Sequence, residues 1–318
     1  MKTVLTKSPI EAAEFIKRGG AVAFPTETVY GLGANVFDEK AIGKIFEAKK
    51  RPNDNPLIAH VGNFGQIEAL VSEITPSAQK FIEAFFPAPL TLVLPKAERV
   101  PFAATAHLET IGVRMPKTAL ALEFLRHCET PLVAPSANLS GRPSPTTWQA
   151  VYEDLTGRIE CILQGGETTE IGLESTVVDC TANAPLILRA GSITLEDLQK
   201  IVPDTRIYRA SKNEQPKSPG LKHRHYSPRA RVVLVSDLRF RVSNRSAYIG
   251  LNEPCEKFDL IKICRSVEDY AHQFFKFFRE CDHRHIREIY CETVEEKGIG
   301  LALMDRLKRA AEGGAASS

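Results

Sequence analysis

The chain has 318 residues, of which 43% are hydrophobic and 25% charged, and its formal net charge is +2. This near-neutral balance excludes a surface that binds polyanions over its whole extent, so any contact with nucleic acid has to come from a local basic patch. Seven cysteines without a C-x-x-C pair argue against a disulfide framework and a structural zinc site, and no apolar run is long enough for a membrane helix or a leader segment. We therefore expect a cytoplasmic protein with reduced thiols, no membrane contact and, from its length, two domains.

The first strand, over residues 21–24, is an apolar run bounded by two glycines and a proline. It leads into the turn T-E-T-V-Y-G-L-G, which begins at Thr26 and is rich in hydroxyl groups. Asp38 then caps a helix that Pro52 ends, and a second strand is predicted over 57–61. The other elements predicted in this half are helices over 10–17, 64–71, 77–86, 119–128, 147–155 and 195–201 and strands over 90–94, 109–116, 131–135, 173–179 and 185–189.

Three consecutive cations, Lys49, Lys50 and Arg51, stand at the end of the helix that Asp38 begins. We expect them to face the hydroxyl-rich turn, and such a cluster is costly unless an anion neutralises it, so a polyphosphate is the expected ligand. The alternative is that the two lysines only occupy the negative end of the helix dipole. That alternative accounts less well for Arg51, because it lies beyond the last helical turn.

The strand over 109–116 alternates cleanly between apolar and polar side chains. Thr110, Gly112 and Arg114 share one face, which is poor core material but suits the floor of a ligand site. Glycine permits close approach, and arginine offers a forked donor to phosphate or carboxylate. An ordinary half-exposed strand remains the alternative.

The segment P-S-A-N-L-S-G-R-P-S-P-T-T, over 135–147, is a rigid loop rich in small polar residues. Thr146 and Gln149 are predicted to form a capping box, which places the loop at a helix N-terminus. It lacks the G-K-[ST] ending of a Walker loop, and the earlier G-L-G lacks the third glycine of a dinucleotide fingerprint. Either simple turn chemistry or an oxygen-rich ligand accounts for its polar side chains, Ser136, Asn138, Ser140 and Ser144.

Two later strands carry polar side chains at their ends. In L-E-S-T-V-V-D, Ser175 shares a face with Val177 and Asp179. The strand over 185–189 ends at Arg189, which could reach a phosphate or could pair with a surface carboxylate. Thr194 is predicted to cap the helix that follows.

Composition changes near residue 205. Residues 206–231 contain eight Lys or Arg and a single acid, with three prolines, which indicates an extended basic linker. Within it, S-P-G-L-K-H-R-H-Y-S-P contains aromatic and imidazole groups that suit a lid folding over a site, although a solvated tether is the alternative. The predicted division is 1–205, 206–230 for the linker and 231–318 for a second domain.

The second domain alternates between strands and helices. This order predicts a small parallel, Rossmann-like sheet, and no glycine-rich phosphate loop accompanies it. The H-R-H segment at 283–285 has no zinc-ligand partners at a recognisable spacing. The predicted strands cover 231–236, 246–251, 260–264 and 287–291, and the helices cover 267–279 and 298–311.

The motifs P-T-E-T-V-Y-G-L-G, K-R-P-x-x-x-P-L-I, P-S-A-N-L-S-G, E-S-T-V-V-D and R-x-G together strongly resemble those of the YrdC/Sua5 family of threonylcarbamoyl-AMP synthases. The linker motif and the second domain are similar to the longer, two-domain Sua5 type. The resemblance implies an α/β fold with a YrdC-like twisted mixed sheet, flanking helices and a basic concave groove, followed by the smaller Rossmann-like domain.

The resemblance also implies a reaction in which L-threonine, bicarbonate (or CO2) and ATP give L-threonylcarbamoyl-adenylate and pyrophosphate. The product is the activated donor for the t6A modification of tRNA, so the downstream partner is the threonylcarbamoyl transferase machinery, with a possible weak tRNA contact. Magnesium is expected to arrive with ATP, and no resident metal site is predicted. No Ser-His-Asp or Cys-His arrangement is recognisable, which agrees with phosphoryl-centred chemistry based on positioned cations.

Site residues follow from the resemblance position by position. The threonine pocket would contain Thr28, His60, Ala134 and Ser175. ATP would be held by Arg51, Asn55, Thr110, Arg114, Ser136, Ser144, Arg189, His225 and Tyr226. The catalytic cations would be Lys50, Arg51 and Arg114.

Two rival functions remain open at this point. The first is a non-catalytic RNA-binding module that uses the basic groove and linker to hold a tRNA backbone. The second is carbamoyl transfer in hydrogenase maturation, where a similar domain occurs. That second class carries additional acylphosphatase-like and zinc-finger segments, and this sequence has neither.

Overall fold

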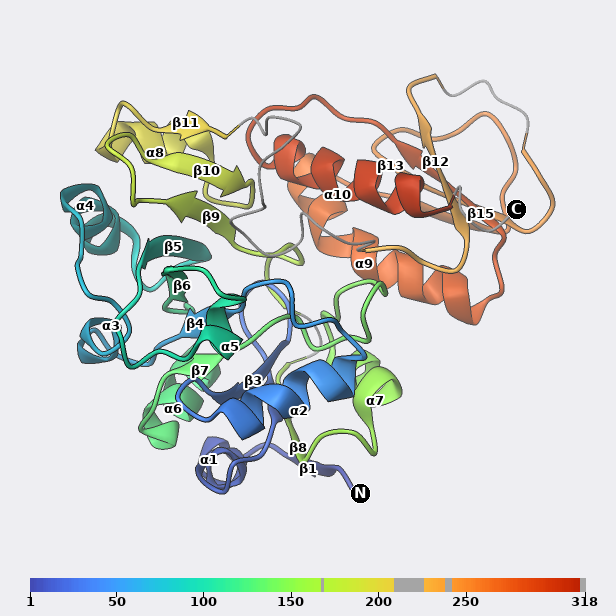
Figure 1. The fold of residues 1–318 in the computed structure, drawn as a ribbon. Helices are drawn as coiled ribbons and strands as arrows, with labels where there is room; N and C mark the ends of the chain where they lie inside the picture. Colours follow the sequence, from blue (N-terminus) through green and yellow to red (C-terminus); the bar gives the residue numbers. More distant parts are fainter. Residues whose placement is uncertain (167–168, 209–225, 238–241, 315–318) are drawn as a thin grey trace.

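The structure is a computed structural model that describes residues 1–166, 169–208, 226–237 and 242–314. Two sheets organise this part of the chain, a large mixed sheet in the N-terminal two thirds and a small parallel sheet near the C-terminus (Figure 1). The predicted pairing of a twisted mixed sheet with a smaller parallel α/β domain is confirmed. The predicted linker lies mostly in residues 209–225, outside the described residues, so its role as a lid stays a prediction.

Eleven described strands form the large sheet, in the order β1-β8-β2-β3-β7-β4-β6-β5-β9-β10-β11. Their bounds are β1 Val4–Thr6, β2 Val22–Phe24, β3 Gly31–Asn35, β4 Ile58–His60, β5 Leu90–Pro95, β6 Thr110–Arg114, β7 Leu132–Val133, β8 Cys161–Leu163, β9 Thr176–Asp179, β10 Leu186–Arg189 and β11 Arg206–Ile207. β11 pairs with β10, so the sheet includes two residues that the sequence assigns to the linker.

One prediction about the first turn is wrong. Residues 31–35 are strand β3, which pairs antiparallel with β2, rather than part of a loosened turn. The two glycines of this strand serve packing, because a Cβ on Gly33 would come within 3.0 Å of the Phe24 ring and one on Gly31 within 3.3 Å. A glycine pair that signals a turn in the sequence therefore makes room for an aromatic side chain of the neighbouring strand.

Helices cover the large sheet, with bounds α1 Pro9–Lys17, α2 Glu39–Lys49, α3 Gly65–Glu68, α4 Pro76–Phe85, α5 Phe102–Thr105, α6 Ala119–Cys128, α7 Trp148–Leu155 and α8 Leu195–Ile201. The predicted caps Asp38 and Thr194 are confirmed, and Ser8 caps α1; each accepts a bond from a backbone N–H of the first turn. The predicted cap of α7 is wrong by one residue. Thr147, and not Thr146, accepts from Ala150 N. The predicted helix over 64–71 is reduced to the single turn of α3.

The small sheet has the order β12-β15-β13-β14, and each neighbouring pair is parallel. Its elements are β12 Arg231–Val235, β13 Ser246–Gly250, β14 Leu260–Ile263, α9 Val267–His283, β15 Glu288–Glu292 and α10 Ile299–Gly314. One core cluster joins α9 and α10 to this sheet and includes the phenylalanines predicted to make α9 apolar, Phe274, Phe275, Phe277 and Phe278. This burial of apolar area supplies most of the stability of the small domain.

The two parts of the chain pack closely. A Cβ on Gly172 would lie 2.6 Å from the backbone oxygen of His272 in α9, so glycine is required for this approach. Arg279 of α9 and Arg306 of α10 both form ion pairs with carboxylates of the N-terminal part, and both arginines are at least nine-tenths buried. The small domain is therefore fixed to the large one by buried charges as well as by apolar packing.

Candidate functional site

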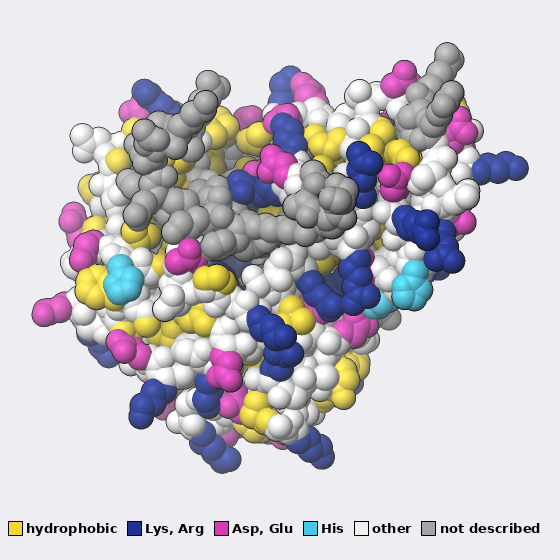
Figure 2. All heavy atoms as spheres, turned by 45° about the vertical axis from the view of Figure 1, so that its right-hand side comes forward, with side chains coloured by type: hydrophobic (Ala, Val, Ile, Leu, Met, Phe, Trp, Pro, Cys, Tyr) yellow, Lys and Arg dark blue, Asp and Glu magenta, His cyan; other side chains and the backbone are white. Residues whose placement is uncertain are grey.

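A pocket of about 650 Å³, partly open to solvent, lies at the strand ends of the large sheet. Residues from seven separated segments of the chain line it, namely Thr26, Thr28, Val29, Tyr30, Gly31, Arg51, Pro56, Leu57, Ile58, His60, Arg114, Ala134, Pro135, Ser136, Glu174, Ser175, Arg189 and Tyr226. Three of these are arginines and one is a glutamate. Figure 2 shows that Lys, Arg, Asp and Glu side chains are interspersed over the face of the molecule that it presents.

Arg51 reaches the pocket because the helix before it ends abruptly. Lys50 adopts the left-handed conformation, with φ of 51°, and Pro52 prevents further helix. Arg51 Nη2 donates to Asn55 O at 3.1 Å, while its buried Nε has no partner among the described residues. Burial lowers the pKa of Arg51 to about 10, so it remains charged at neutral pH. The charged guanidinium of Arg51, whose buried Nε has no described partner, is suited to binding an anion.

The two lysines before Arg51 have different positions from those predicted. Lys49 is buried, and its ammonium donates to Ser136 O and, at 2.7 Å, to Asn138 O, so it holds the polar loop rather than a ligand. Burial, with help from the nearby Arg51, lowers the pKa of Lys49 well below its ordinary value. Lys50 is exposed and does not line the pocket. The expectation that all three cations face one ligand is therefore corrected for Lys49, whereas the catalytic role expected of Lys50 stays a prediction.

Arg114 lies in the pocket wall but is already paired. Its Nη2 donates to Glu27 Oε1 at 2.7 Å, and the two side chains are 5% and 0% exposed. Glu27 Oε2 also accepts from Lys117 N, which ties the first turn to the end of β6. The buried Nε of Arg114 has no partner within the described part of the chain. Arg114 thus fixes the turn after β2 and keeps one donor for a ligand.

The four residues predicted for threonine, Thr28, His60, Ala134 and Ser175, all line this one pocket. Thr28 and Thr26 share a hydrogen bond of 2.8 Å. His60 Nδ1 lies 3.1 Å from Ile58 O, and burial, reinforced by the charge of Arg114, lowers the pKa of His60 to about 3. His60 is therefore neutral at physiological pH and can exchange hydrogen bonds with a small polar ligand.

Arg189 joins the same wall from the end of β10. Its Nη2 donates to Ser175 O at 2.9 Å and to Ser175 Oγ at 3.1 Å, and Ser175 Oγ lies 2.8 Å from Thr91 Oγ1. Among the described residues, no surface carboxylate forms an ion pair with Arg189, which was one of the two alternatives left open by the sequence. The pKa of Arg189 is lowered by burial, with the charges of Arg306 and Arg114 adding to this effect.

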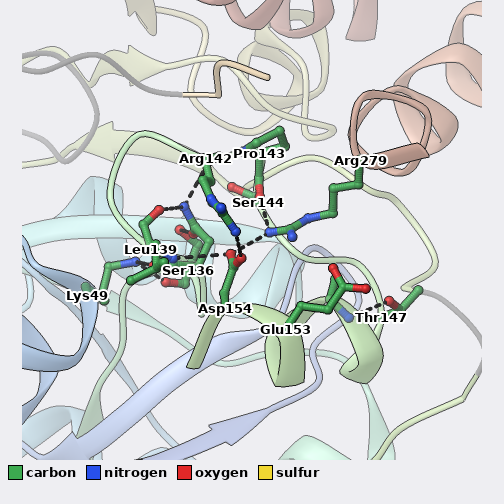
Figure 3. Close-up of polar contacts among 12 residues, drawn as sticks. Lys49, Ser136, Leu139, Arg142, Pro143, Ser144, Thr147, Glu153, Asp154 and Arg279 are labelled. Atoms are coloured by element: carbon green, nitrogen blue, oxygen red, sulfur yellow. Dashed lines mark hydrogen bonds and ion pairs between the residues drawn. The ribbon is translucent and has the colours of Figure 1, made fainter. Parts of the chain in front are cut away.

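The polar loop is organised from beneath by Asp154 of α7 (Figure 3). This buried carboxylate accepts from Leu139 N at 3.3 Å, from Arg142 at 2.6 Å and from Arg279 at 2.8 Å. Burial by itself would raise the pKa of Asp154, but the two arginines outweigh burial and hold it below its usual value. Ser136 at the other end of the loop donates to Asn138 Oδ1 at 2.6 Å. The loop is therefore rigid before any ligand binds.

Four predicted ATP residues lie outside the main pocket or outside the described chain. Thr110 lines an adjacent cleft of about 260 Å³, which shares Pro56–Ile58 with the main pocket. Asn55 is buried beside Arg51, with its Nδ2 unpartnered within the described residues. Ser144 is buried and donates to Glu174 Oε1 at 2.6 Å. His225 falls outside the described residues, whereas Tyr226, next to it, is buried and lines the main pocket.

Several functional candidates were missed from the sequence. Lys49 was expected to act in the same way as Lys50 and Arg51. Its position two residues before Arg51 in the chain was only a weak indication that it has a different role. Glu174 stood beside the recognised Ser175 in L-E-S-T-V-V-D, but its role depends on Arg306, which is 132 residues away in the chain. A contact of this length leaves no local pattern in a single sequence.

Residues 1–166, 169–208, 226–237 and 242–314 contain no group of three or more His, Cys, Asp or Glu that could hold a metal ion. No described helix is long and apolar enough to cross a membrane.

The fold and the pocket define a two-domain α/β protein with an arginine-lined ligand site at the strand ends of its larger sheet. Two family models match the chain, "Telomere recombination" of the Sua5-YciO-YrdC group over residues 14–191 and "Threonylcarbamoyl-AMP synthase, C-terminal domain" over residues 193–312. The chain belongs to the Sua5-type, two-domain family of threonylcarbamoyl-AMP synthases, and it is an enzyme.

Similar proteins cover nearly the whole chain. The threonylcarbamoyl-AMP synthase of Pyrococcus abyssi is 46% identical over 94% of this chain and 92% of its own. That of Bacillus subtilis is 39% identical over 95% of this chain and 92% of its own. The crystal structure of P. abyssi Sua5 complexed with L-threonine has a TM-score of 0.88 and 43% identity, and the match covers 98% of this chain and 97% of that one.

Proposed function

We propose that the pocket joins L-threonine, bicarbonate and ATP into L-threonylcarbamoyl-adenylate. The threonine amine and bicarbonate give a carbamate and water. A carbamate oxygen then attacks the α-phosphorus of ATP, the bond between that phosphorus and the bridging oxygen breaks, and pyrophosphate leaves. The single observation that carries the proposal is the convergence of three arginines, one buried and two half-buried, and four small polar or neutral side chains on one pocket.

The arginines are proposed to bind the nucleotide phosphates. Arg51 and Arg114 each keep a buried donor that no described residue accepts, and a ligand oxygen would satisfy both. Charge that develops on the phosphates in the transition state is then stabilised by donors that are already in place. Ser136 and Tyr226 line the same wall and would contact the rest of the nucleotide.

Threonine is proposed to lie beside Thr28, His60, Ala134 and Ser175. A neutral His60 can accept from or donate to a polar group without adding charge, and Ser175 is held by Arg189. The structure of P. abyssi Sua5 complexed with L-threonine supports this assignment. Fixing both substrates in one rigid pocket orients the carbamate oxygen towards phosphorus, which accounts for much of the expected acceleration.

Magnesium is proposed to enter with ATP rather than to reside in the protein. The described residues offer no cluster of three metal ligands, and the pocket contributes mainly guanidinium and hydroxyl groups. When bound to the nucleotide, the ion would neutralise phosphate charge.

The product is proposed to serve tRNA modification. A mixed carbamate–phosphate anhydride hydrolyses easily, so a threonylcarbamoyl transferase acting on tRNA has to take it up. A weak contact of this enzyme with tRNA would shorten the distance over which the product is transferred. The free cysteines of the described structure fit a reducing, cytoplasmic location.

The test is incubation with ATP, magnesium, threonine and labelled bicarbonate. Formation of a labelled adenylate, with pyrophosphate release that requires both threonine and bicarbonate, is the expected result. Absence of ATP turnover, together with an RNA affinity that falls steeply with salt, would favour the RNA-binding alternative instead.

A further inference from the structure

A carboxylate stands in the wall of the proposed nucleotide pocket. Glu174 lines the pocket and is 7% exposed. Its Oε1 accepts from Ser144 Oγ at 2.6 Å, and its Oε2 accepts from Arg306 Nε at 3.3 Å. Both oxygens are thus held, one by the N-terminal domain and one by the C-terminal domain.

Arg306 lies on α10 and is 0% exposed, although it belongs to the domain that does not form the pocket. Its Nη1 donates to Ala190 O at 2.7 Å, directly after the pocket residue Arg189. Its guanidinium carbon lies 5.9 Å from the centre of the Tyr226 ring. One side chain therefore touches three segments of the pocket wall, those of Glu174, Arg189 and Tyr226.

The charge balance explains why an arginine is needed at this position. A buried carboxylate without a partner is strongly unfavourable, and here it would also repel the phosphates of a nucleotide. The second acid near Arg306 is Asp305, whose side chain is 35% exposed and therefore partly solvated. Glu174 thus forms its ion pair with Arg306, and the charge of the nearby Arg189 adds to its neutralisation at the pocket wall.

We propose that Arg306 is a positioning residue for the nucleotide, which neutralises Glu174 and holds it in the wall so that the pocket accepts a polyphosphate. This inference rests on the proposed function of the pocket. It gives the C-terminal domain a role in ATP affinity that operates through Glu174.

The two substrates provide an internal comparison. ATP is a polyanion, whereas threonine is a zwitterion without net charge. Exposing an unneutralised Glu174 should therefore weaken ATP much more than threonine. A purely structural loss of packing would impair both substrates or the fold, and would not depend on the charge of Glu174.

The experiment compares Arg306→Met, Glu174→Gln and the double variant, with Arg309→Met of the next helical turn as a matched control. The dissociation constant of ATP is measured by equilibrium dialysis without threonine, and the KM of each substrate is measured by pyrophosphate release. We expect Arg306→Met to raise both ATP constants about tenfold or more, with threonine changed by less than about threefold. Adding Glu174→Gln should restore the ATP constants to within about threefold of the wild type.

Two results would overturn the inference in an active wild type. They are wild-type ATP affinity in Arg306→Met and a double variant as impaired as Arg306→Met. If Arg306→Met does not fold, the double variant decides, because it removes both charges and should be soluble and bind ATP. A wild type that neither binds ATP nor forms the adenylate would instead refute the proposed function, and the inference with it.

Discussion

The ends of the two sheets differ in how their polar groups are satisfied. At the end of the small sheet, Glu292 of β15 accepts from Tyr248 Oη at 2.9 Å, from Leu251 N at 2.6 Å and from both nitrogens of Asn252. At the end of the large sheet, Arg51 Nε and Asn55 Nδ2 are buried and have no partner in the described chain. Because an unpartnered buried donor costs about 1–3 kcal/mol, this end of the large sheet has a physical reason to bind a ligand.

The same comparison shows how the two domains divide their work. At the end of the small sheet, a carboxylate satisfies the neighbouring donors, and the small domain supports the pocket indirectly. Arg279 and Arg306 of its helices bond to Pro143 and Glu174 of the large domain, and Glu174 lines the pocket. A sheet end with satisfied donors is structural, and one with unsatisfied donors is a candidate site.

The largest effect is expected for Arg114→Ala. It leaves Glu27, whose side chain is fully buried, without its counter-charge, and the expected loss in the free energy of unfolding is about 3–5 kcal/mol. Urea denaturation measures this loss. Lys200→Ala, which removes a largely exposed ion pair, is the control and should cost at most about 1 kcal/mol. A cost for Arg114→Ala as small as that of the control would show that the pair does not hold the pocket wall.

Arg51→Ala directly tests the unpartnered donors at the end of the large sheet. We expect kcat/KM to fall by about 10²–10³, with the unfolding transition retained, because a preorganised charged donor is lost. Pyrophosphate release measures the activity, and Arg18→Ala on the exposed end of α1 is the matched control. Lys50→Ala should lower activity far less than Arg51→Ala, since Lys50 is exposed. Equal losses for the two variants would restore the three-cation cluster predicted from sequence.

Glu292→Ala tests the end of the small sheet, where the polar groups already have partners. It removes four accepted hydrogen bonds, and we expect the C-terminal domain to lose about 2–3 kcal/mol of unfolding free energy. Pyrophosphate release at a temperature where the variant is folded should match the wild type within about twofold. A large specific loss of kcat would mean that this strand end also takes part in the reaction.

The smallest effect concerns pH. The pKa of His60 is about 3 in the folded protein and about 6.5 when unfolded, so the unfolded chain binds the proton first as pH falls and stability decreases below about pH 6.5. Between about pH 7.5 and 5.5 the wild type should lose about 1.4 kcal/mol more than His60→Gln. Chemical denaturation of both proteins at the two pH values measures the difference. Identical pH dependence would show that His60 titrates normally in the fold.

Sequence reasoning succeeded where the cause is local. Apolar periodicity and caps such as Asp38 and Thr194 act within one helical turn, so they gave most elements to within a few residues. It failed where packing overrides local preference. The glycines at Gly31 and Gly33 signal a turn, but they lie in β3 because the Phe24 ring needs their space.

The sequence by itself determined the family, the order of elements and the motifs that converge on the pocket, because these depend on residue identity and short spacing. Only the tertiary structure decided which neighbouring cations face that pocket. The left-handed turn at Lys50 leaves Lys50 exposed, while Lys49 is buried under the polar loop and Arg51 lines the pocket. Tertiary structure also brought Arg306 to Glu174, since folding sets the distance between segments far apart in the chain, and no local pattern in a single chain records it.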